Sequence, residues 1–205
     1  MKRATKGNIK NIIIDAIESA ATEYYEMSGE RLGKAPEYYL NVKIVDFITS
    51  KIPTLGYKLE MQVKELLEHF GVNSSDNPDD LRDTGNFDIT LLSKKTKTPR
   101  HVIEVKRGIK LESLMKDARR ISALAQEKHG SKRLSTGFIV FINRVSYCSR
   151  SARHQDRLDE RLTCIRNQIG NHFSVTGLYH TLEKGVYGYS DDKGLSVNIF
   201  EISLI

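Results

Sequence analysis

Apolar residues recur at helical spacing along four stretches of the chain, and each stretch predicts an amphipathic helix. The first stretch covers 9–27 and ends at Ser28-Gly29, where a glycine can stop a helix. The second begins near Pro36, a residue favoured in the first turn, and the other two cover 111–125 and 153–169. The first helix is either an added or partner-binding element or, more simply, a helix that packs on the protein's own core.

Runs of apolar and β-branched residues predict strands between and after these helices. The clearest runs are 87–92, 101–106 and 137–142, and two more lie at 173–182 and 195–202. The segment 57–61 alternates, so it is either a short first strand or the start of a helix that runs to Phe70. This mixture of elements predicts an α/β protein with a central sheet flanked by helices.

The length of 205 residues fits one domain, and no repeat or low-complexity linker divides the chain. We expect an N-terminal helical extension (1–35), a core (36–142) and a C-terminal part with a helix and strands (143–205). The polar stretch 72–86 predicts a surface loop, because its aspartates lack the spacing of a calcium-binding loop.

Three charged residues interrupt the apolar runs and are the candidate chemical groups. Asp88 lies at the start of one run, and Glu104 and Lys106 lie two apart in the next, so both point to one face of a strand. Two carboxylates can bind a hard divalent cation through oxygen, and the lysine can orient an attacking water. The alternative is an ion pair between Glu104 and Lys106 on an edge strand, with Asp88 as a turn residue after Gly85-Asn86.

With these residues the chain resembles the PD-(D/E)XK nuclease superfamily, through Asp88 and the sequence Glu104-Val105-Lys106. It departs from the motif because Asn86-Phe87, and no proline, precedes Asp88; Pro78-Asp79 lies upstream in the polar stretch. The resemblance implies a restriction-endonuclease-like core, in which a mixed sheet places a parallel strand beside an antiparallel hairpin that carries the motif. It also implies Mg²⁺, for which Mn²⁺ can substitute, bound by Asp88, Glu104 and the Val105 carbonyl oxygen.

The resembled superfamily often places a further glutamate from its first core helix at the metal site. Glu37 lies in the first turn of the helix near Pro36 and is the candidate for that role. Its alternative role is a carboxylate favoured by the positive end of the helix dipole. Glu60 is a second candidate for the additional carboxylate.

The net charge of +6 is concentrated in one segment of the sequence. Between Lys94 and Lys110 lie seven basic residues and a single acid, so the rest of the chain is neutral. Such a segment attracts a phosphate backbone, which makes the following residues candidate nucleic-acid contacts. They are Arg107, Lys110, Lys94, Lys95 and Arg100. For Lys94 and Lys95 a solvated hairpin turn is an equal alternative.

These features predict a metal-dependent nuclease with DNA as the preferred candidate substrate. A non-catalytic nucleic-acid-binding or assembly module is the alternative, and a homodimer would explain double-strand cleavage. No apolar run reaches the length of a membrane span, and we expect a cytoplasmic protein whose Cys148 and Cys164 remain reduced. His101 is expected to be a surface histidine at a strand end, with contact to a phosphate as the alternative.

Overall fold

The computed structural model describes residues 3–71, 85–108, 110–129, 132–146 and 151–205. The helices are α1 (Lys6–Ser28), the short 3₁₀ helix η1 (Leu32–Lys34), α2 (Glu37–Lys51), α3 (Val63–Phe70), α4 (Leu111–Gln126) and α5 (Ser151–Ile169). The strands of the main sheet are β1 (Leu55–Gln62), β2 (Asn86–Ser93), β3 (Pro99–Arg107), β6 (Thr136–Ser146), β7 (Phe173–Thr181) and β8 (Lys193–Leu204). A separate ribbon pairs β4 (Lys128–His129) with β5 (Lys132–Arg133).

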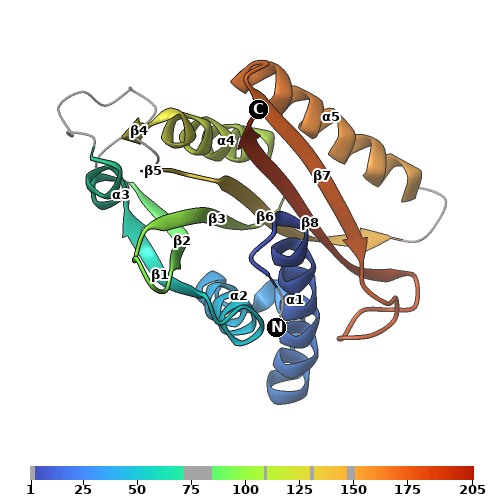
Figure 1. The fold of residues 1–205 in the computed structure, drawn as a ribbon. Helices are drawn as coiled ribbons and strands as arrows, with labels where there is room; N and C mark the ends of the chain where they lie inside the picture. The colour runs from blue at the N-terminus through green and yellow to red at the C-terminus, as the bar shows by residue number, and fades with distance from the viewer. Residues whose placement is uncertain (1–2, 72–84, 109, 130–131, 147–150) are drawn as a thin grey trace.

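Six strands form one mixed sheet in the order β1-β2-β3-β6-β8-β7 (Figure 1). The central pair, β3 and β6, is parallel, and every other neighbouring pair is antiparallel. Helix α4 connects the parallel pair, as a parallel connection requires. This arrangement confirms the predicted α/β fold with a mixed central sheet flanked by helices.

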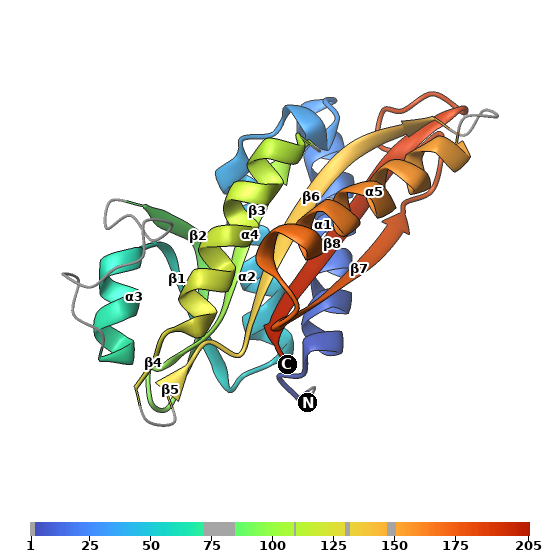
Figure 2. The same cartoon turned by 90° about the horizontal axis from the view of Figure 1, so that it is seen from above.

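Helices cover both faces of the sheet, with α1 and α2 on one face and α4 and α5 on the other (Figures 1 and 2). Ile103 and Val105 of β3 face α1 and α2, whereas Val102 faces α4. Alternation along the strand therefore turns Glu104 and Lys106 toward α4.

Helix α1 packs on the protein's own core and belongs to the same layer as α2. Eight of its residues are buried, including Ile12 and Ile17. The Thr5 hydroxyl accepts a hydrogen bond from the Asn8 amide at the N-terminus, and Gly29 ends the helix with φ 69°. Of the roles considered for this segment, packing on the core is the one that the structure shows.

The two interpretations of the segment near Tyr57 are both partly right. Strand β1 occupies it, and the separate helix α3 follows at once and ends at Phe70. Strand β6 is longer than its apolar run and continues through polar residues to Ser146. Most of the polar stretch 72–86, with its aspartates and Pro78, lies outside the described residues, and Asn86 already belongs to β2.

Candidate active site

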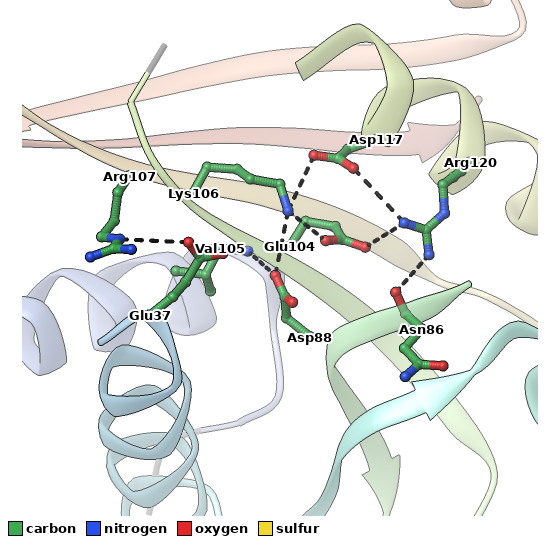
Figure 3. Close-up of polar contacts among 9 residues, drawn as sticks. All are labelled: Glu37, Asn86, Asp88, Glu104, Val105, Lys106, Arg107, Asp117 and Arg120. Atoms are coloured by element: carbon green, nitrogen blue, oxygen red, sulfur yellow. Dashed lines mark hydrogen bonds and ion pairs between the residues drawn. The ribbon is translucent and has the colours of Figure 1, made fainter. Parts of the chain in front are cut away.

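The structure brings together the three charged residues that the sequence singled out (Figure 3). Asp88 comes from β2, and Glu104 and Lys106 come from β3. The Lys106 ammonium lies 3.0 Å from Glu104 Oε2 and 3.7 Å from Asp88 Oδ2. The Glu104 side chain is only 2% exposed, so this is a buried charge cluster and not the solvent-exposed ion pair of an edge strand.

Asp88 sits where the ladder between β2 and β3 ends. The last paired residues are Ile89 and Ile103, and beyond them Asp88 Oδ2 accepts a hydrogen bond of 2.7 Å from the Val105 amide. The amide and carbonyl of one strand residue point to the same side, so the Val105 carbonyl also faces the gap beside Asp88. The end of the ladder thus gathers a carboxylate and a main-chain carbonyl in one place.

A third carboxylate, Asp117 of α4, completes the surroundings of Lys106. Its Oδ2 lies 3.6 Å from the Lys106 ammonium, and its side chain is 5% exposed. The sequence analysis missed this residue. The signal was present, because Asp117 occupies the apolar stripe of the helix between Leu114 and Ile121, where an acid has no packing role.

Arg120 of α4 is a second member of the site that the sequence did not identify. Its guanidinium lies 3.3 Å from Glu104 Oε1, donates to the Asn86 carbonyl at 2.7 Å and stacks over the Phe87 ring. Glu104 Oε1 has no aligned hydrogen-bond donor among the described residues, although the charge of Arg120 is close. Arg120 therefore balances the charge of this oxygen but does not form a hydrogen bond with it.

Burial and the neighbouring Asp88 raise the pKa of Glu104 to about 8. Burial alone would lower the pKa of Lys106, but Glu104, Asp117 and Asp88 outweigh it and raise that pKa above its usual range. Lys106 therefore remains an ammonium and acts as a hydrogen-bond donor, and both Glu104 oxygens lie near a cation of the protein.

Glu37, the expected additional carboxylate, lies at the edge of this cluster. It is half-buried at the start of α2, 3.7 Å from the Arg107 guanidinium. Burial raises its pKa, and the charges of Lys106 and Asp88 also act on it. Glu60 lies between Leu59 and Met61, whose partners in the ladder are Ile89 and Phe87, but its side chain is exposed and its backbone has φ 51°. Neither residue approaches Lys106 as closely as Asp117 does.

The oxygen groups of the cluster fit a hard cation in chemical type but are engaged by cations of the protein. Asp88, Glu104 and the Val105 carbonyl are the oxygen ligands that Mg²⁺ accepts. In the part of the chain that the structure describes, no group of three or more histidine, cysteine or acidic residues is placed to hold a metal ion. The unsatisfied Glu104 Oε1 and Asp117 Oδ2 are the atoms that remain available for one.

A hollow of about 470 Å³ lies beside the cluster, at the ends of the parallel strands β3 and β6. Four cations line it, and among its described lining residues none is acidic. They are Arg31, Lys34, Arg107 and Arg144. Arg107 links this basic hollow to the cluster, because it contacts Glu37 and donates to the Ala35 carbonyl at 2.8 Å.

The basic segment identified in the sequence is split between two ends of the molecule. Lys94 and Lys95 lie in the turn between β2 and β3, and Arg100 follows at the start of β3. At about 3.3 Å per residue, the five steps from Pro99 to Glu104 separate this turn from the cluster by roughly 17 Å. Lys94, Lys95 and Arg100 therefore lie at the other end of β3 from the cluster.

Lys110 and His101 differ in their exposure. Lys110 is exposed and precedes the first turn of α4, where contact with a nucleic acid stays a prediction. His101 is 5% exposed, so the expectation of a surface histidine is wrong: packing of the α1 layer over this face covers it. Cys164 is a free thiol, and Cys148 lies outside the described residues.

Comparison with known proteins gives no match: no protein-family model, curated protein or solved structure is similar to the chain. Among the described helices, none is both long and apolar enough to cross a membrane.

Proposed function

We propose that this protein is a metal-dependent nuclease of the PD-(D/E)XK type that hydrolyses phosphodiester bonds, with DNA as its substrate. The observation that carries the proposal is the Lys106 ammonium, which is held among Asp88, Glu104 and Asp117 at the end of a parallel strand. Burying three carboxylates together is costly unless they bind a cation. The basic hollow next to them offers a polyanion the opposite charge.

Asp88, Glu104 and the Val105 carbonyl are the groups that would hold Mg²⁺ or Mn²⁺. When bound, the ion would stabilise negative charge on the scissile phosphate and lower the pKa of a bound water. The protein's own contribution is positional. Lys106, kept protonated by its carboxylates, donates a hydrogen bond that orients the attacking water, while solvent or Glu37 accepts the proton.

Arg120 and Asp117 prepare this arrangement from α4. Arg120 balances the charge of Glu104 before a metal enters, and Asp117 holds Lys106 from the side opposite Asp88 (Figure 3). To hold a metal ion, Glu104 would give up its contact with one of these cations. We expect Mg²⁺ affinity to increase with pH, because the raised pKa of Glu104 makes its proton compete with the metal.

A non-catalytic nucleic-acid-binding module is the second candidate, and one observation favours it. Lys106 and Arg120 already contact the carboxylate oxygens, and no preformed metal site is found among the described residues. Such a module would use the basic hollow alone.

Cleavage assays separate the two candidates. The protein is incubated with single-stranded, duplex and branched DNA, and with RNA, in the presence of Mg²⁺, Mn²⁺ or a chelator. The nuclease proposal expects cleavage only with metal and its loss in Glu104→Gln, whereas Lys95→Gln, at the distant turn, retains it. Binding of nucleic acid without cleavage under either metal would support the module instead.

A further inference from the structure

A second cavity, of about 530 Å³, lies at the opposite end of β3 from the charge cluster. Its walls come from the start of α1, the loop before β1, the end of β2 and the first residues of β3 and β6. It shares no lining residue with the basic hollow or with the charge cluster. A cavity of this volume has the size of a small-molecule site.

Two buried polar side chains line this cavity without partners. His101 and Thr136 are register neighbours on β3 and β6, so their side chains lie next to each other on one face of the sheet. His101 is 5% exposed and Thr136 is fully buried, yet His101 Nδ1 and Thr136 Oγ1 have no hydrogen-bond partner among the described residues. Unpaired buried polar atoms are costly, and such a pair needs a water or a ligand to satisfy it.

The remaining walls favour an anion. Arg100 and Lys6 line the cavity, and Lys6 shares its charge with Glu201 at 3.4 Å. The cavity also touches the N-terminus of α1, a helix of 23 residues whose first amides have no acceptor within the helix. Hydroxyl groups line the rest, from Thr5, Thr54, Ser93 and Ser135.

The histidine is neutral in this setting and can serve as a donor. Burial, Arg100 and Lys6 lower the pKa of His101 to about 4. A neutral imidazole carries one N–H donor and one acceptor nitrogen, and a threonine hydroxyl can donate as well. Together with the two cations and the helix amides, these groups place several hydrogen-bond donors around the cavity.

We propose that the cavity lined by His101, Thr136, Arg100 and the start of α1 binds a phosphoryl group. A tetrahedral oxyanion offers several acceptor oxygens for the donors that line the cavity, and its charge matches Arg100 and the helix N-terminus. The phosphoryl group comes either from a small phosphorylated molecule or from a nucleic-acid backbone. The site does not depend on the proposed nuclease activity, because it lies at the other end of the strand.

The first experiment uses inorganic phosphate as the probe. Protein with isotope-labelled histidines is titrated with phosphate, with chloride at equal ionic strength as the control, and ring signals are followed by NMR. Saturable movement of the His101 signals, identified with a His101→Asn variant, is expected. Arg100→Gln, at an exposed side chain, is expected to weaken binding roughly tenfold, as for loss of one charged hydrogen bond.

A matched pair of variants separates a ligand role from a structural one. Thr136→Val removes the unpartnered hydroxyl, so it is expected to weaken phosphate binding without lowering the melting temperature in phosphate-free buffer. Thr90→Val removes another fully buried, unpartnered hydroxyl that does not line the cavity. It is expected to leave phosphate binding unchanged.

A parallel titration with a single-stranded oligonucleotide in chelator identifies the source of the phosphoryl group. Movement of His101 with inorganic phosphate supports a small molecule, and movement with the oligonucleotide alone supports a nucleic-acid backbone. If neither probe moves the His101 signals, or if Arg100→Gln binds phosphate as wild type does, the proposal is wrong. A protein that binds phosphate here but cleaves nothing would contradict only the nuclease.

Discussion

The two ends of β3 both bury polar side chains, but they differ in the charges and hydrogen-bonding atoms that the protein leaves without a partner. At the carboxyl end, Glu104 and Asp117 meet the cations Lys106 and Arg120. With Asp88 included, three carboxylates face two cations, so the ionised cluster keeps one negative charge in excess. Such a site can still gain from a metal ion.

At the amino end of β3 the balance of charge is the opposite. His101 and Thr136 are uncharged and unpaired, and the nearest charges include Arg100 and Lys6. The amino end therefore has unused hydrogen-bond donors and positive charge, whereas the carboxyl end has an excess of negative charge. Where buried polar groups keep an unbalanced charge or unpaired hydrogen-bonding atoms, these indicate which kind of ligand would bind there.

The substitution Lys106→Ala is expected to have the largest effect on the carboxyl end of β3. Cleavage should fall by about a hundredfold or more, because the donor that orients the attacking water is lost. Stability should also fall, by about 3 kcal/mol, because the buried Glu104 and Asp117 and the partly exposed Asp88 lose their shared partner. Adding Asp117→Asn should recover part of that stability and none of the activity, as measured by denaturant unfolding and cleavage rates. An active Lys106→Ala protein would remove the lysine from the mechanism.

Glu104→Gln should raise stability at pH 8 while it abolishes cleavage. The pKa of Glu104 is higher in the folded protein, about 8, than its ordinary value of 4.5, so the folded state holds a proton that the unfolded state releases. Wild-type stability should therefore decline as pH rises from about 4.5 to 8. The variant should lose this decline, so its stability in thermal or denaturant unfolding should change less than that of the wild type over this pH range. A parallel decline in both proteins would show that Glu104 is ionised throughout.

Glu37→Gln tests whether the edge of the cluster belongs to the site. Loss of the charge should lower the cleavage rate roughly tenfold to a hundredfold if Glu37 accepts a proton. Stability should change little, since the amide keeps the shape and Arg107 retains its bond to the Ala35 carbonyl. The reverse result, with full activity and a loss of a few tenths to about 1 kcal/mol of stability, would assign Glu37 to the helix dipole.

The smallest expected effect concerns the basic hollow. Lys34→Gln and Arg144→Gln should each weaken nucleic-acid binding a few-fold and lower the log–log salt slope by roughly one. Lys94→Gln and Lys95→Gln, in the distant turn, are matched charge controls and should leave the slope unchanged. A lower slope for the turn lysines and an unchanged slope for the hollow would move the substrate path to the other end of β3.

The α/β fold class and the core of the cluster follow from local patterns in the sequence. Period-two alternation places Glu104 and Lys106 on one face of a strand wherever that strand lies, and Asp88 opens the neighbouring strand of the same hairpin. These are local relations, which the order of residues fixes before any packing. The same is true of Gly29 at the end of α1, which the periodic pattern already indicated.

The groups that join those residues from distant parts of the chain depend on how the helices pack on the sheet. Asp117 and Arg120 reach the cluster because α4 packs across β3, and the basic hollow assembles from Arg31, Arg107 and Arg144, far apart in the chain. His101 is buried because its face of β3 lies beneath α1 and α2. Each of these depends on which face of a sheet a helix covers, and that choice is made by burial of apolar surface summed over the whole fold, not by any local spacing.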